Sequence, residues 1–278
     1  MPIARPLQVR LATAGALIPL IVAAVVLLPA PAFAAFVGVV VCWAAFEWAG
    51  LLGLGSVPAR ASYVGAMAAS LALWWRYAGP AWDLPLLMLG SLWWVAVVPV
   101  LLRITPLKRR AGVDVGLLPL GLLVLVPPWV ALVRLHEAGA QGPWLVMGLL
   151  MLIWIADSAA YFVGRQFGRR RLAPALSPGK TWAGVYGALA GAALWGALLA
   201  FLLSWPIQGS ALLVVLCVAV AAVSIVGDLF ESLLKRRRDL KDTGHLLPGH
   251  GGMLDRIDSL TAAAPLFVLG FVWLKGVV

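Results

Sequence analysis

Acidic side chains with the spacing of metal or phosphate chemistry crowd into one C-terminal stretch of the chain. Six of the eleven acids lie there: Asp228, Glu231, Asp239, Asp242, Asp255 and Asp258. Asp228 and Glu231 are three residues apart, as are Asp255 and Asp258, so each pair shares one face of a helix. Helix capping accounts for one acid at a helix start, but not for two pairs that flank a basic loop. Oxygen ligands at this spacing suit Mg²⁺, which also binds substrate phosphates.

The residues between the two acid pairs are of the types that bind phosphate. Cations of both kinds, point charges and forked guanidinium groups, are Lys235, Arg236, Arg237, Arg238 and Lys241. The stretch PGHGGMLDRID (248–258) adds His250, Arg256 and three glycines, Gly249, Gly251 and Gly252. Glycines let backbone amides approach an anion, here just before the start of an expected helix. We therefore predict a polyphosphate site, with ordinary loop packing as the alternative.

A second polar cluster precedes the first by about fifty residues. Asp157, Tyr161 and Arg165 end one apolar run, and Ser177, Lys180 and Thr181 begin the next. Lys180 and Arg165 favour a second anion contact. Ser177 and Thr181 could instead cap the helix that follows them. Glu47 is an isolated acid near the end of an apolar run, and the sequence names no partner for it.

The usual signatures of soluble nucleotide-binding and hydrolytic sites do not occur. GxxxxGK[ST], GxGxxG and HExxH patterns are all missing. His245 and His250 have no serine or cysteine nearby in a triad-like arrangement, which argues against a covalent enzyme intermediate.

The elements that must position these residues are membrane helices. Of the 278 residues 63% are hydrophobic and only 12% are charged, and the mean hydropathy is +1.00. A soluble domain of this size could not hide so much apolar surface. Apolar runs long enough to cross a bilayer lie near 11–28, 33–52, 62–80, 85–103, 116–134, 143–164, 182–204, 211–231 and 260–277. We expect an all-α integral membrane protein with about nine transmembrane helices, forming a single polytopic domain over 1–278 whose motif-rich part is 157–258.

Basic residues follow the loops of one side. If the loops alternate across the bilayer, eighteen of the 21 Lys and Arg residues share the side of the N-terminus. The exceptions are Arg76, Arg134 and Lys275. By the positive-inside rule the N-terminus and the candidate active site are cytoplasmic. Topology alone explains Lys108–Arg110, and no nucleic-acid partner is implied by the net charge of +10.

Three segments together resemble the phosphatidate cytidylyltransferase (CDP-diacylglycerol synthase) family. The long signature runs from Ser232 through Lys235, Arg236, Lys241, Asp242 and Gly244 to LPGHGGMLDRID (247–258). The segments DSAAYFVGR (157–165) and SPGKT (177–181) are also similar to the family. One departure is Ala183, where the family often has a glutamate.

The resemblance implies a bacterial inner-membrane enzyme, usually a homodimer, that converts CTP and phosphatidate into CDP-diacylglycerol and pyrophosphate. It implies Mg²⁺, with K⁺ as a possible second ion, and Asp228 and Asp255 as metal ligands. The residues expected to be catalytic are Asp228, Lys235, Lys241, Asp242, His250, Asp255, Arg256 and Asp258. Those expected to bind substrate are Asp157, Tyr161, Arg165, Ser177, Lys180, Thr181, Arg236, Gly251 and Gly252.

Two alternatives remain open at this point. The enzyme could transfer the same group to another lipid phosphate, such as a prenyl-type one. From a different class, membrane carboxylates could mark an ion-coupled transporter, although transporters place such acids near mid-membrane on broken helices. A CDP-alcohol phosphotransferase is disfavoured because its DGxxAR…GxxxDxxxD pattern is missing.

Overall fold

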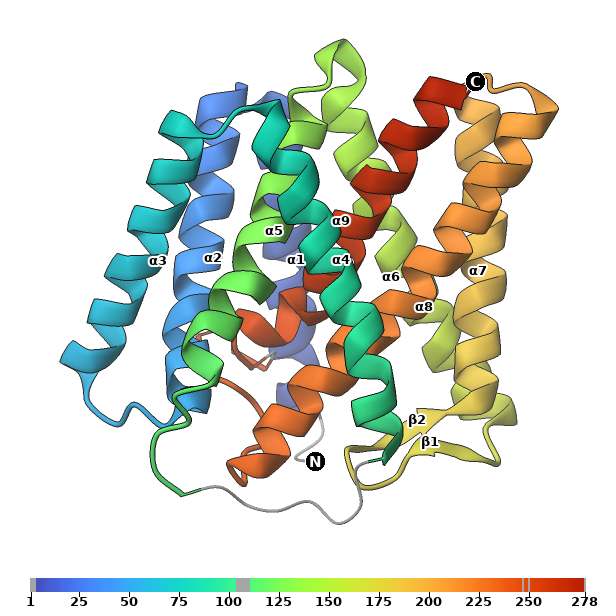
Figure 1. Cartoon of the computed structure of the whole chain (residues 1–278). Helices are drawn as coiled ribbons and strands as arrows, with labels where there is room; N and C mark the ends of the chain where they lie inside the picture. Colours follow the sequence, from blue (N-terminus) through green and yellow to red (C-terminus); the bar gives the residue numbers. More distant parts are fainter. Residues whose placement is uncertain (1–3, 104–110, 247, 250, 278) are drawn as a thin grey trace. The chain divides into compact units, whose positions relative to one another are not determined.

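The computed structural model describes residues 4–103, 111–246, 248–249 and 251–277, with side chains from residue 12 to residue 276. Nine α-helices occur among these residues: α1 (Ala4–Leu27), α2 (Ala30–Leu52), α3 (Val57–Tyr77), α4 (Pro80–Arg103), α5 (Leu117–His136), α6 (Gly142–Phe167), α7 (Trp182–Leu202), α8 (Ile207–Arg237) and α9 (Leu254–Val277) (Figure 1). Each corresponds to one of the nine predicted apolar runs. A short 3₁₀ helix, Gly139–Gln141, precedes α6.

Seven of the described helices are long and apolar enough to cross a membrane. They are α2, α4, α5, α7, α8, α9 and the helix ending at Phe167. The predicted multi-pass membrane protein is therefore confirmed in its class. The seven helices do not include α1, with its apolar part Ala12–Leu27, or α3, so the count of nine spans stays a prediction.

A small β-hairpin departs from the purely helical expectation. Strand β1 (Arg171–Ala173) pairs antiparallel with β2 (Ser177–Thr181), with Arg171 opposite Thr181 and Ala173 opposite Ser177. The segment SPGKT, which the sequence indicates as a turn, is thus an extended strand leading directly into α7. The strands are too short to show the alternation of apolar and polar residues by which a strand is recognised.

The chain forms two compact units. Unit 1 consists of residues 1–79, 109–147 and 234–257, and unit 2 of 80–108, 148–233 and 258–278. The long helices α6, α8 and α9 each contribute to both units.

In unit 1, α2 packs against both α3 and α5 (Figure 1). Aromatic side chains tie these helices together through their polar atoms, as buried Trp and Tyr usually do. Trp48 Nε1 donates to Leu117 O at 3.0 Å, and Trp129 Nε1 donates to Ala34 O at 3.0 Å. Tyr63 of α3 donates to Leu118 O at 2.9 Å. Hydrogen bonds therefore join the helices of unit 1 from which the predicted cytoplasmic loops begin.

In unit 2, small residues bring helices into close contact. A Cβ added at Gly187 of α7 would lie 2.7 Å from Val163 Cβ of α6, and one at Gly191 would lie 3.1 Å from Ala159 Cβ. Likewise, a Cβ at Gly227 of α8 would lie 2.6 Å from the Asp258 carbonyl oxygen of α9. Small residues at such interfaces are typical of membrane helices, because lipid-facing helices associate through close packing.

Candidate active site

The carboxylate of Asp255 is the centre of a buried cluster in unit 1. Its Oδ1 atom lies 2.6 Å from the Lys235 ammonium, and the two side chains are 4% and 12% exposed. Its Oδ2 atom accepts hydrogen bonds from the backbone of Thr243 at 2.9 Å and of Gly252 at 2.8 Å. The Thr243 hydroxyl lies 3.1 Å from the same oxygen. Thus α8, the loop after it and the first turn of α9 meet at one carboxylate.

Glu47 of α2 binds the same loop from the other side. It is 4% exposed, and its two oxygens accept from Met253 N at 3.0 Å and Leu254 N at 2.7 Å. The Thr243 hydroxyl also lies 2.9 Å from Glu47 Oε2. Backbone amides at a helix start lack partners within the helix, so Glu47 supplies an acceptor for the start of α9.

The start of α9, which the sequence predicts to bind phosphate, is occupied by carboxylates of the protein itself. The amides of Gly252, Met253 and Leu254 donate to the carboxylates of Asp255 and Glu47. Phosphate binding at Gly251 and Gly252 therefore stays a prediction, and in this conformation internal carboxylates hold the amides.

Arg238 fastens the end of α8 to the end of α2. Its guanidinium donates to Leu51 O at 2.7 Å, to Leu52 O, and to Gly112 O at 2.7 Å. The last carbonyl groups of a helix receive no hydrogen bond from within the helix. At the end of α2, the guanidinium of Arg238 donates to two of them. The basic run 235–238 therefore contributes to folding, through Arg238, as well as to the positive charge of this region.

Asp228 of α8 forms a second lysine–aspartate pair, in unit 2. Its Oδ2 atom is paired with Lys180 of β2, and the side chains are 30% and 26% exposed. Ser232, one turn further along α8, donates to Asp228 Oδ1 at 3.4 Å. The structure thus joins two candidates, Lys180 and Asp228, that lie 48 positions apart in the chain.

Thr181 and its neighbours have structural contacts. Thr181 is buried, and its hydroxyl accepts from Gly184 N at 3.1 Å as the N-cap of α7. This contact matches the capping alternative for Thr181, whose substrate role stays a prediction. On α6, Arg165 donates to the Tyr161 hydroxyl at 3.2 Å, and both side chains are exposed.

The remaining candidates are placed as follows. Lys241, Asp242 and Arg256 are exposed, Asp157 is exposed on α6, and Ser177 is half-buried on β2. Arg236 donates to Leu240 O at 3.2 Å, and Asp258 lies in the first turns of α9, where its Oδ1 accepts from Ser259 N at 2.6 Å. His250 lies outside the described residues. The roles of all these residues stay predictions.

Two participants were missed by sequence reasoning, Thr243 and the loop-binding role of Glu47. Thr243 is a small polar residue inside the signature, and no spacing rule singles it out. Glu47 had a signal, because an acid inside an apolar run is a functional candidate by default. Its partners lie 196 to 207 positions away, so no local pattern could name them.

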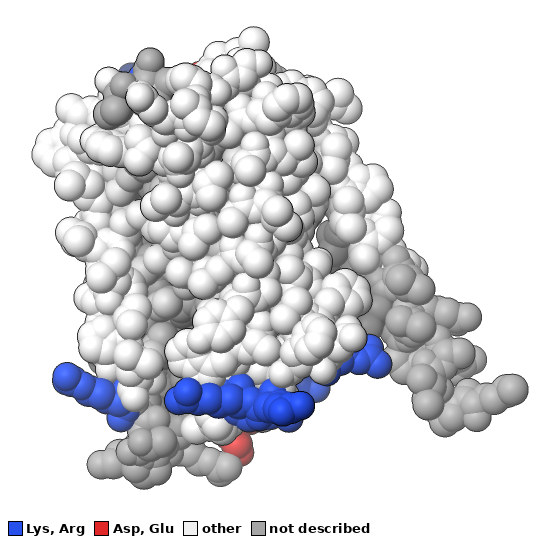
Figure 2. Space-filling view, turned by 90° about the vertical axis from the view of Figure 1, so that its right-hand side faces the viewer, with Lys and Arg blue, Asp and Glu red and all other residues white. Residues whose placement is uncertain are grey.

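Basic residues also gather at the surface near the hairpin. Figure 2 shows Lys and Arg side chains along one edge of the viewed face, below a broad surface of uncharged residues. In unit 2 the exposed Arg165, Arg169, Arg170 and Arg171 follow one another from the end of α6 to β1. Such an edge suits anionic headgroups or nucleotide phosphates.

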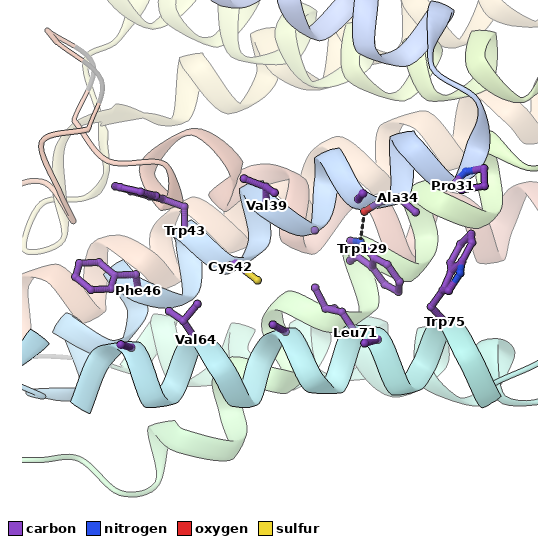
Figure 3. A pocket seen from close by; sticks show the side chains of 15 residues that line it. Pro31, Ala34, Val39, Cys42, Trp43, Phe46, Val64, Leu71, Trp75 and Trp129 are labelled. Atoms are coloured by element: carbon purple, nitrogen blue, oxygen red, sulfur yellow. Dashed lines mark hydrogen bonds between the residues drawn. The ribbon is translucent and has the colours of Figure 1, made fainter. Parts of the chain in front are cut away.

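A large cavity in unit 1 is apolar and contains none of the predicted site residues. It has a volume of about 710 Å³ and is lined by α2, α3 and Trp129 of α5 (Figure 3). Phe46 and Trp43 of α2 line it, whereas the adjacent Glu47 binds segments 243–244 and 252–254, called the signature loop below. One face of α2 therefore lines an apolar cavity and another binds the signature loop. The predicted site residues lie outside this cavity.

The two aspartates differ in their capacity for a metal ion. Within the described part of the chain, no three His, Cys, Asp or Glu side chains form a ligand group. Mg²⁺ usually needs only one or two carboxylates, since waters and substrate phosphates complete its shell. Asp228 fits this demand, with one lysine, one long hydrogen bond and a part-exposed side chain. Asp255 already accepts from three donors, the Lys235 ammonium and the backbone N–H groups of Thr243 and Gly252, which leaves it less capacity for a metal ion.

The helices define a polytopic membrane protein, and each of its two units contains a lysine–aspartate pair of candidate site residues. The model of the cytidylyltransferase family matches residues 8–274. The chain belongs to that family.

Curated relatives agree with this assignment. A phosphatidate cytidylyltransferase of Pseudomonas aeruginosa is 40% identical over 271 residues, which is 97% of this chain and 98% of the relative. Proteins of the same name from Haemophilus influenzae and Thermotoga maritima are 47% identical over 130 residues and 42% identical over 147 residues. These two matches cover 46% and 51% of this chain, and 45% and 53% of the relatives.

Proposed function

We propose that the protein transfers the cytidylyl group of CTP to phosphatidate, giving CDP-diacylglycerol and pyrophosphate. The observation that carries this proposal is the 40% identity over 97% of the chain to a phosphatidate cytidylyltransferase. The cluster around Asp255 supports it, because it is built from residues of the signature 232–258.

The reaction demands charge neutralisation more than proton transfer. An oxygen of the phosphatidate phosphate forms a bond to the α-phosphorus of CTP, and the bond from that phosphorus to the bridging oxygen of pyrophosphate breaks. The attacking phosphate is already a competent nucleophile, so no strong side-chain base is needed. Repulsion between two anions is the main obstacle, and fixed cations lower it.

The side chains available for this task differ in exposure. Lys180 is part-exposed on β2, and Lys241 and Arg256 are exposed near the signature loop. We assign to these residues the binding of substrate phosphates and of the leaving pyrophosphate. Lys235 is mostly buried against Asp255, so its charge acts on the loop first.

Mg²⁺ is the metal we propose, with Asp228 and Asp255 as candidate ligands and K⁺ as a second ion. When bound, Mg²⁺ offsets the negative charge of phosphate oxygens. Asp228 would exchange its lysine contact for the metal, while Asp255 would have to release Lys235 or Thr243.

We further propose a location in the bacterial inner membrane, with the N-terminus and the site in the cytoplasm, and a homodimer as the assembled form. The distribution of Lys and Arg over the loops supports the orientation. Crosslinking of the protein in membranes would test the dimer, and labelling of a cysteine introduced in the 239–242 loop would test its side.

The direct test uses purified protein, labelled CTP and defined lipid phosphates with Mg²⁺. Label should appear in CDP-diacylglycerol, with one pyrophosphate released per product. Phosphatidate and a prenyl phosphate are compared in parallel, and preferential labelling of the prenyl lipid would assign the alternative substrate. Absence of labelled lipid with every acceptor would overturn the proposal.

A further inference from the structure

Glu47 is a buried acid to which the cytidylyl-transfer chemistry assigns no task. It lies on α2, 196 positions before its first partner in the signature loop. Burying a carboxylate in a membrane helix is costly, and its three close partners are all donors: Met253 N, Leu254 N and the Thr243 hydroxyl. A carboxylate, which only accepts, matches this set.

Two glycines of the signature are shaped around this carboxylate. A Cβ at Gly244 would overlap Glu47 Oε1, and its three nearest atoms would all belong to Glu47. A Cβ at Gly252 would overlap Glu47 Oε2 and Thr243 Oγ1. Neither glycine has a positive φ, in contrast to Gly249 and Gly251. Space for Glu47, and not backbone conformation, therefore requires glycine at 244 and 252.

Thr243 connects Glu47 with the candidate catalytic carboxylate. Its hydroxyl lies 2.9 Å from Glu47 Oε2 and 3.1 Å from Asp255 Oδ2. The backbone N–H of the same residue donates to Asp255, as does that of Gly252, which packs on Glu47. Moving Glu47 would therefore shift two of the donors that orient Asp255.

We propose that Glu47 is a positioning residue, which sets the conformation of segments 243–244 and 252–254 and thereby the orientation of Asp255. Glu47 acts through the loop and does not touch substrate. The activity arm of its test rests on the proposed cytidylyl transfer, whereas the stability arm does not.

The first arm compares two buried acids. Glu47→Gln keeps the size of the side chain but places an amide where only acceptors fit. We expect kcat per folded enzyme to fall about tenfold or more, the effect of losing hydrogen bonds to a charged acceptor. Because Glu47 does not touch CTP, the KM of Glu47→Gln for CTP should change less than about threefold.

The matched control is Asp83→Asn, at an acid of α4 that is 7% exposed. It should leave kcat per folded enzyme within about twofold of the unsubstituted protein, as expected for an acid outside the signature 232–258. Equal losses of kcat in the two variants, or an unchanged kcat in Glu47→Gln, would overturn the positioning role.

The second arm measures thermal unfolding in detergent and asks whether a shorter acid reduces the cost of a methyl group added to the loop. Gly244→Ala should lower the unfolding midpoint of the unsubstituted protein. Glu47→Asp is itself less stable, because the shorter acid loses hydrogen bonds to the loop, but in this background Gly244→Ala should lower the midpoint less, because the carboxylate has withdrawn by one methylene. Gly251→Ala is the control: its φ of +82° strains any side chain, so it should lower the midpoint equally in both backgrounds.

The arms separate the two ideas. If the unsubstituted protein makes no CDP-diacylglycerol but Gly244→Ala costs less in the Glu47→Asp background, the proposed function fails and the packing of the loop on Glu47 stands. If Gly244→Ala lowers the midpoint equally in both backgrounds, or is harmless, the inference about Glu47 is wrong whatever the activity.

Discussion

Each of the two units contains one lysine–aspartate pair of candidate site residues, and the surroundings of the two pairs differ. In unit 1 the Lys235–Asp255 pair is nearly inaccessible, and Asp255 also accepts from two backbone N–H groups. In unit 2 the Lys180–Asp228 pair is about a quarter exposed, with one long hydrogen bond from Ser232. Buried pairs are costly to break, whereas exposed pairs contribute little to stability. We therefore expect the first pair to stabilise the signature loop and the second to be accessible to a ligand.

The largest stability effect should come from the buried pair. Lys235→Met leaves the Asp255 carboxylate buried without its cation, which costs about 3–5 kcal/mol of folding free energy. The measurement is unfolding of the purified protein in detergent, with Lys180→Met as the matched variant at the exposed pair. Lys180→Met should lose at most about 1 kcal/mol. Equal losses in the two variants would show that burial does not distinguish the two pairs.

The exposed pair should show its effect in substrate binding. Lys180→Met is expected to raise the apparent KM for CTP or phosphatidate about tenfold, the loss of one charge-assisted phosphate contact. Steady-state kinetics with each substrate varied in turn would identify the phosphate concerned. Lys180→Arg, which keeps the charge, should lose less, and unchanged KM values in Lys180→Met would assign this pair to the fold as well.

The smallest expected effect concerns stability and compares two neighbouring residues of β2. Thr181 is adjacent to Lys180 but caps α7, so Thr181→Ala should cost about 1 kcal/mol of stability. Thr181→Ser retains the hydroxyl and should be close to neutral in the same unfolding measurement. A change in KM without a change in stability would instead give Thr181 the substrate role that its position in SPGKT suggests.

The helices were predictable because membrane spans are recorded locally in the sequence. The predicted runs 33–52 and 182–204 correspond to α2 and α7 within about three residues, since apolar length alone defines them. Prediction failed where polarity and helix diverge: α8 continues to Arg237, past its apolar run. The hairpin 171–181 is held by pairing between short segments, which no periodicity in the sequence indicates.

The sequence indicated candidate site residues, but it did not indicate which of them pair with one another. Chemistry and spacing indicated Asp228, Lys180, Lys235 and Asp255, yet which lysine faces which aspartate depends on how the helices pack. The glycines illustrate the limit, because Gly252 was assigned to an approaching phosphate. In the structure its neighbour is Glu47, from a helix at the other end of the sequence. Contacts of that range are formed by the tertiary fold alone.

The most direct test of the account is cytidylyl transfer by Asp255→Asn compared with the unsubstituted protein. Both proteins are purified from membranes and supplied with labelled CTP, phosphatidate and Mg²⁺. We expect labelled CDP-diacylglycerol from the unsubstituted protein and none above background from Asp255→Asn, although the variant still inserts into the membrane. Near-normal product formation by Asp255→Asn would contradict the central place given to this carboxylate.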